Sequence, residues 1–193
     1  VNNYSSLGYN DCWGYTAPDG REYALLGVYN GLSIIDVTDV SQSKEVAFIR
    51  GNGSGWRDVK TYLHYAYVVN EDGGGMQVIN LENLPESASL VKTYTDFSTS
   101  HNIFINEETG VLYAEGTGSR PVRTIKIDRP EQPRQVSTFG IACHDIYARG
   151  HLVYVAEASA GSIGIYDLSS TTFPKLVTRI NVPSSGYVHN VWV

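Results

Sequence analysis

The 193-residue sequence has few of the residues that cross-link or anchor a small protein. Its two cysteines, Cys12 and Cys143, are too few to define a disulfide framework or a zinc ribbon. No apolar run is long enough to cross a membrane as a helix. There are 14 lysines and arginines against 20 acidic residues, and no basic run. Nucleic acid and anionic membranes are therefore poor candidate partners.

Helical patterning is also missing. Long windows of Ala, Leu, Glu and Lys at a spacing of 3.6 residues do not occur, whereas the chain contains 14 tyrosines and 19 glycines. Tyrosine favours strands and glycine favours tight turns. With 42% hydrophobic residues, the composition predicts an all-β protein with a substantial core.

Short strand-like motifs recur at a nearly constant interval. The motif that begins each repeat starts, at spacings of 47, 44, 43 and 45 residues, at Asn10, Arg57, His101, His144 and His189. Each repeat contains three further strand-like segments, of which "EYALLGV", "GLSIIDVTD" and "EVAFIR" are the first set. Four short strands in about 40–45 residues are typical of a β-propeller blade.

The sequence therefore predicts a β-propeller with four four-stranded blades and the first strand of a fifth. The predicted blades span 10–56, 57–100, 101–143 and 144–188, and the fifth begins at 189–193. A lone inner strand has no partner within its own blade. We therefore expect the chain to form part of a larger ring; the alternative is that "VNNYSSLGY" closes a four-bladed ring.

Several of these motifs resemble a known family. "GLSIIDVTD" followed by "SKEVAFI", and the run "WRDVKTYLHYAYVVNEDGGGMQVINL", look like the LVIVD-repeat propellers of the choice-of-anchor B family. The resemblance covers essentially the whole chain and implies a secreted or cell-surface protein, mostly bacterial, although the later blades and the anchor of that family are missing. The sequons at Asn3 and Asn52 are compatible with glycosylation of a secreted protein.

Polar residues at the start of each inner strand form the candidate site. Equivalent positions of successive blades lie on one circle, so we expect the following side chains near the channel axis: His101, His144, His189, Asp11 and Asp58. Imidazole and carboxylate groups together are ligands for a divalent transition metal, which would make these residues a metal site. The interpretation that we favour is structural: these side chains cap backbone groups where strands enter a water-filled channel.

Other conspicuous residues have simpler structural interpretations. Asp36, Asp128 and Asp167 are predicted to make Asx-turns, and "EDGGG" a turn between strands. Cys143 is predicted to be a buried small hydrophobe or half of a disulfide, and the tryptophans Trp13, Trp56 and Trp192 to pack between blades. Glu115 and Glu157 are a further candidate pair for acid–base chemistry.

No nucleophile motif such as G-x-S-x-G is present. We therefore expect a non-catalytic binding or scaffold module that meets a protein or glycan at the cell surface. One alternative is a metal-dependent enzyme with an axial histidine site. Another is a structural subunit of an extracellular oligomer or filament, joined through an open blade edge.

Overall fold

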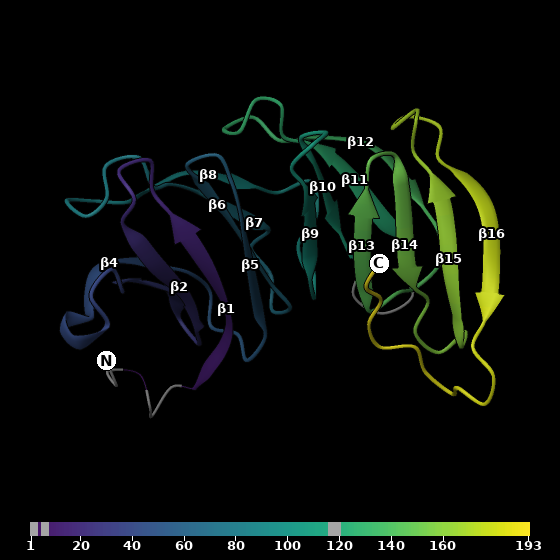
Figure 1. Cartoon of the computed structure of the whole chain (residues 1–193), viewed down its shortest axis with the longest axis horizontal. Coiled ribbons are helices and arrows are strands. Elements are labelled where there is room, and N and C mark those ends of the chain that lie inside the picture. Colours follow the sequence, from purple (N-terminus) through teal and green to yellow (C-terminus); the bar gives the residue numbers. More distant parts are fainter. Residues whose placement is uncertain (1–3, 5–7, 116–120) are drawn as a thin grey trace. The chain divides into compact units, whose positions relative to one another are not determined.

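The computed structural model describes residues 4, 8–115 and 121–193. Its regular elements are β-strands, apart from one short 3₁₀ turn, Val40–Gln42. The chain divides into two compact units, Val1–Thr99 and Ser100–Val193. Each unit contains two four-stranded antiparallel sheets, and these sheets are β-propeller blades (Figure 1).

The strands of each blade follow one another in chain order. The first unit contains β1 (Tyr9–Thr16), β2 (Glu22–Val28), β3 (Gly31–Asp36), β4 (Lys44–Arg50), β5 (Arg57–Tyr62), β6 (Tyr65–Asn70), β7 (Met76–Asn80) and β8 (Ser89–Tyr94). The second contains β9 (Ile103–Asn106), β10 (Val111–Ala114), β11 (Val122–Lys126), β12 (Arg134–Phe139), β13 (Asp145–Arg149), β14 (Leu152–Ala156), β15 (Ser162–Asp167) and β16 (Lys175–Asn181).

The four blades share one irregularity, which confirms that they are copies of a repeat. In every blade the register shifts between the third and fourth strands, as expected of a β-bulge. The shifts fall at Ile34/Ile35, Val78/Ile79, Thr124/Ile125 and Ile165/Tyr166. The predicted all-β propeller with four four-stranded blades is thus confirmed.

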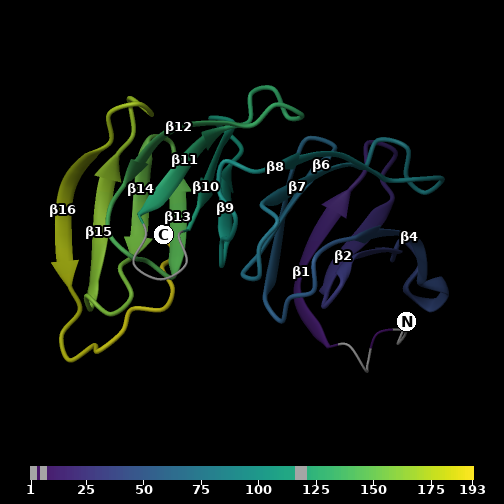
Figure 2. The same ribbon diagram turned by 180° about the vertical axis from the view of Figure 1, so that it is seen from behind.

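The core of each unit lies between the faces of its two blades. β6 and β10 are buried along their whole length. In contrast, β16, which is the outer strand of its blade (Figure 2), is exposed throughout. Val59 and Ile34 belong to one buried cluster in the first unit, and Ile146 and Val122 to another in the second. Each such aliphatic side chain contributes about 1.5–3 kcal/mol when fully buried.

The structure differs from the sequence prediction at the start of the inner strands. His101 and His144 lie just before β9 and β13 rather than within them. Residues 189–193, predicted as the first strand of a fifth blade, contain no strand; an isolated bridge joins Val188 to Ala158 instead. His101 and His144 therefore lie at the ends of the strand ladders; the backbone N–H of His144 still donates to the Ala156 carbonyl at 3.0 Å.

The predicted turns are present after the third strands. The backbone N–H of Thr38 donates to Asp36 Oδ1 at 3.0 Å, and that of Ser169 donates to Asp167 Oδ1 at 2.7 Å. These Asx-turns direct the chain towards the outer strand, while the turn at Asp128 remains a prediction. Residues 71–75, "EDGGG", connect β6 to β7, also as predicted.

Candidate functional site

Three imidazole rings come together in the second unit. The Nε2 atoms of His101 and His144 lie 3.1 Å apart, and their ring centroids are separated by 4.7 Å. The ring of His189 also contacts that of His144, with 3.7 Å between centroids. The three residues, the histidine cluster, are thus in contact, while their place at the channel axis remains a prediction.

Hydrogen bonds assign the protons within the histidine cluster. His144 Nδ1 lies 3.0 Å from the carbonyl oxygen of His189, which can only accept, so Nδ1 carries the proton. When neutral, His144 therefore accepts through Nε2, and His101 donates from its own Nε2. His189 Nδ1 faces the side-chain oxygen of Asn190, which leaves the basic lone pair of His189 on Nε2.

The residue that directly follows each histidine helps to hold the cluster in place. Asp145 Oδ2 accepts from the Asn190 amide and from the Val191 backbone N–H, both at 3.3 Å. Asn102 donates its amide to the His144 carbonyl at 3.0 Å. These bonds fix the backbone that carries His144 and His189, so the imidazoles are positioned before any ligand arrives.

The environment of His144 favours its neutral form. Burial and the neighbouring imidazoles of His189 and His101 lower the pKa of His144, and they outweigh the opposing effects of the His189 carbonyl and Asp145. His144 and His101 are half-buried, whereas His189 is exposed. The cluster therefore combines a neutral, sheltered imidazole with one that solvent reaches.

The equivalent positions in the first unit carry a different chemistry. Lys60 Nζ lies against Asp58 Oδ1 and 3.5 Å from Asp11 Oδ2, and it also sits 4.6 Å above the Trp13 ring. Burial alone would raise the pKa of Asp11, but the hydrogen bond with Asp58 and the charge of Lys60 lower it overall. These residues form the lysine–carboxylate cluster of the first unit. That Asp11 and Asp58 share a circle with the histidines remains a prediction.

The metal hypothesis has no support in this geometry. Across residues 4, 8–115 and 121–193, no group of three or more His, Cys, Asp or Glu side chains is arranged to hold a metal ion. In the histidine cluster the Nε2 atoms of His101 and His144 face each other, and the Nδ1 atoms of His144 and His189 face a carbonyl and an amide oxygen, so these four nitrogens are not directed at a common point. The divalent-metal site at His101, His144, His189, Asp58 and Asp11 therefore stays a prediction.

Glu157 is buried in its blade, and its carboxylate is fully hydrogen-bonded there. It is fully buried and accepts hydrogen bonds from Ser162, Tyr166 and Arg179 at 2.5–2.8 Å. A carboxylate with this many donors has no capacity left for proton transfer. The acid–base pair proposed for Glu115 and Glu157 therefore gains no support from the structure.

The remaining sequence candidates are structural or lie outside the site. Cys143 is a free, buried thiol whose pKa is raised by burial, which is the behaviour of a small hydrophobe, and Cys12 is free and exposed. Trp13 packs on β5, where its indole donates to Thr61 at 3.1 Å. The Asn52 amide donates to the Gly73 carbonyl at 3.0 Å, and Asn3 lies outside the described residues.

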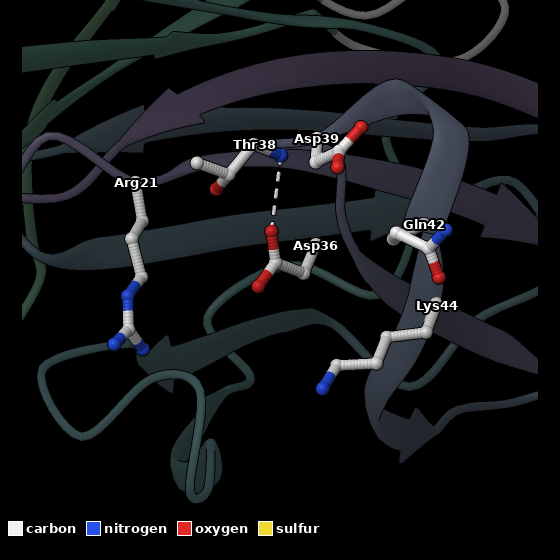
Figure 3. Close-up of a pocket in the computed structure, with 6 residues that line it drawn as sticks. All are labelled: Arg21, Asp36, Thr38, Asp39, Gln42 and Lys44. Atoms are coloured by element: carbon white, nitrogen blue, oxygen red, sulfur yellow. Dashed lines mark hydrogen bonds between the residues drawn. The ribbon is translucent and has the colours of Figure 1, made fainter.

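The first unit also has a surface pocket that was not predicted from the sequence. Its volume is about 310 Å³, and its lining residues, drawn in Figure 3, are Arg21, Asp36, Thr38, Asp39, Gln42 and Lys44. Asp36 and Asp39 are each bonded to the backbone two residues on, at 3.0 and 2.9 Å. The two cations and the two carboxylates balance each other, so the pocket lacks the ordered acid–base groups of the histidine cluster.

Comparison with known proteins identifies the fold but no family. No family model and no curated protein matches the chain. Among solved structures, it is similar to the periplasmic gluconolactonase PpgL of Pseudomonas aeruginosa, with a TM-score of 0.69 and 16% identity over 90% of this chain and 54% of that one. A candidate 6-phosphogluconolactonase from Bacteroides uniformis gives a TM-score of 0.71 and 15% identity over 91% and 55%. The β-propeller domain of Swd1 from Myceliophthora thermophila gives 0.62 and 11% over 86% and 57%.

These neighbours show the fold and correct one prediction. The chain spans only a little over half the length of each of them. Two of the three bear the names of enzymes, which contradicts the expected non-catalytic binding or scaffold module. That prediction is wrong because it took the absence of a nucleophile motif as evidence against catalysis. In the described residues, no helix is long and apolar enough to cross a membrane.

Proposed function

We propose that the histidine cluster is the acid–base centre of a propeller enzyme that hydrolyses a lactone. The observation that carries the proposal is the ordered contact of three imidazoles, His101, His144 and His189, in which the proton positions are set by hydrogen bonds. The fold neighbours named as a gluconolactonase and a candidate 6-phosphogluconolactonase support this reaction class.

Lactone hydrolysis needs a base for the attacking water and an acid for the departing ring oxygen. His189 is exposed and carries its lone pair on Nε2, so it takes a proton from water as the water oxygen bonds to the lactone carbonyl carbon. When the tetrahedral intermediate collapses, the bond between that carbon and the ring oxygen breaks. The proton held by His189 passes to the ring oxygen, and the product is the open hydroxy acid.

The neighbours of His189 favour this proton transfer. The neutral ring of His144 lies against that of His189 at a tilt of 34°, so the imidazolium formed at His189 meets no second positive charge there. Asp145 contributes negative charge through the Asn190 amide that faces His189. The ring of Tyr187 lies 5.9 and 6.1 Å from those of His144 and His189, and we assign its hydroxyl to donating to the oxyanion.

The test is the hydrolysis of D-glucono-δ-lactone, followed with a pH indicator and corrected for the spontaneous reaction. We expect catalysis by the wild-type chain and a loss of about 100-fold or more in His189→Gln, since a positioned acid–base group contributes that much. His151→Gln is the matched control, because His151 is an exposed histidine in the β13–β14 turn of the same unit. A wild-type rate no faster than the spontaneous one, or an equal loss in His151→Gln, contradicts the proposal.

We also propose that the protein acts outside the cytoplasm as a member of the choice-of-anchor B propellers. The LVIVD-like motifs support this assignment, and so does the periplasmic location named for one fold neighbour. Fractionation of cells of the source organism, with an antibody to this chain, is the test. Recovery from the cytosol alone would refute the location.

A further inference from the structure

Each histidine of the cluster has an aromatic residue three positions later in the sequence. These are Phe104 in β9, Tyr147 in β13 and Trp192. The Phe104 and Tyr147 ring centroids are 5.4 Å apart at 52°, and those of Tyr147 and Trp192 are 4.9 Å apart at 57°. The three rings, the aromatic row, thus form a continuous series, each ring three residues after a histidine of the cluster.

Polar groups accompany the aromatic row on the same face of the inner strands. Side chains two residues apart on a strand point to one face, so Asp145 shares a face with Tyr147. The same spacing relates Asn102 to Phe104. An amide or a carboxylate group therefore follows each histidine before the ring in the sequence, and an apolar wall with a few polar groups is the combination found in small-molecule sites.

The rings become more accessible along the aromatic row. Phe104 packs against the buried cluster between the two blades, Tyr147 is half-buried, and Trp192 is 84% exposed. The indole of Trp192 thus has one side against Tyr147 and most of its surface in solvent. Three side chains held by ring contacts present a stacking surface whose conformational entropy is already reduced.

The charges in this region limit what the surface binds. No lysine or arginine occurs in the histidine cluster, among the residues that follow each histidine, or in the aromatic row. These residues are His101, Asn102, Phe104, His144, Asp145, Tyr147, His189, Asn190 and Trp192. The whole chain carries a net charge of −6. A phosphorylated ligand would meet like charge here, whereas an uncharged one would not.

We infer that the aromatic row binds the C–H face of an uncharged sugar lactone and directs its carbonyl towards the histidine cluster. A pyranose-type ring offers an apolar face of C–H groups, which suits an aromatic ring face, and hydroxyl groups at its rim, which suit Asn102, Asp145 and Asn190. This inference rests on the proposed lactone hydrolysis and names its substrate class.

The probe for the test is D-glucono-δ-lactam, an amide analogue that resists hydrolysis, with binding measured by saturation-transfer NMR titration. We expect Trp192→Ala to weaken binding about tenfold, as loss of a stacking partner does, and Trp192→Phe to retain most of the affinity. Trp56→Ala is the matched control, because Trp56 is also exposed, at 57%, but lies in the first unit. Unchanged affinity in Trp192→Ala, or an equal loss in Trp56→Ala, overturns the inference.

The 6-phosphorylated lactam tests the charge argument. We expect it to bind more weakly than the uncharged lactam, and tighter binding overturns the assignment to uncharged lactones. Near-ultraviolet circular dichroism of each variant confirms that folding is retained.

The two proposals fail in different ways. Lactam binding that depends on Trp192, without hydrolysis of the lactone, supports the aromatic row and refutes the proposed catalysis. Hydrolysis that depends on His189, with the same KM in Trp192→Ala as in the wild type, supports catalysis and refutes the aromatic row.

Discussion

The two units place different chemistry at the same positions of one repeat. In the first unit the inner strands β1 and β5 carry Asp11 and Asp58, held by Lys60, with Trp13 below the ammonium group. In the second unit the equivalent stretches carry the histidine cluster and the aromatic row. The first cluster holds one ammonium group between two carboxylates, whereas the second consists of imidazoles in contact with one another.

This difference shows which parts of the repeat are free to vary. The four-stranded order and the bulge before the outer strand recur in all four blades, because they determine how a blade pairs and twists. The starts of the inner strands lie outside the ladder or at its edge, so their side chains change without changing the blade. A catalytic centre on this fold is therefore expected there.

The largest expected effect concerns one hydrogen-bonded carboxylate in each unit, the fully buried Glu157 and the half-buried Glu45. Glu157 in the second unit is fully buried with Arg179 as its charged partner, whereas Glu45 in the first accepts from the hydroxyls of Ser33 and Tyr4. We expect Glu157→Gln to lower the free energy of unfolding by about 3 kcal/mol, because it leaves the Arg179 guanidinium without its counter-charge. Urea unfolding curves measure the loss.

Glu45→Gln is the comparison for this prediction. Its two hydroxyl partners can still bond to an amide oxygen, so the expected cost is below about 1 kcal/mol. Equal effects of the two substitutions would show that the Glu157–Arg179 pair contributes nothing beyond ordinary hydrogen bonds.

A smaller effect is expected in the lysine–carboxylate cluster of the first unit. Lys60→Met preserves the apolar stem over Trp13 but removes the ammonium group, and so leaves the buried Asp58 beside Asp11 without a cation. We expect a loss of about 2 kcal/mol in the free energy of unfolding. The exposed Lys44→Met should stay within about 0.5 kcal/mol, and a comparable loss there would attribute the effect to net charge instead.

Much of the fold was predictable from the sequence because repetition amplifies weak local signals. One alternating segment such as "GLSIID" is ambiguous, but four segments at one period identify a blade. The absence of a strand at residues 189–193 was not predictable, since strand formation there requires neighbours that the pattern of "HNVWV" does not specify. The sequence therefore predicts pairing within a blade better than it predicts the segments between blades.

The candidate site was predictable in position but not in chemistry. The constant spacing of His101, His144 and His189 placed them together, as the ring contacts confirm. Their hydrogen bonds were not predictable, because the direction of each imidazole depends on the His189 carbonyl and on the Asn190 amide. The aromatic row was missed for a similar reason: each ring was considered alone as packing, although the spacing of three from each histidine was visible in the sequence.

The smallest expected effect is a difference in how the two clusters respond to acid. The pKa of His144 is lowered in the folded protein by burial and by the other imidazoles. The unfolded state therefore binds the proton more tightly, so stability falls as the pH drops below about 6.5, the ordinary value for histidine. The pKa of Asp11 is also lowered, but an aspartate ordinarily titrates near 3.9, so its contribution persists until the pH falls below about 4.

Between pH 7.5 and 5, hydrogen exchange corrected for intrinsic rates should therefore accelerate at β13 and remain constant at β5. His144→Gln should remove the pH dependence at β13, and acceleration of equal size at both strands would mean that the histidine cluster is not its source.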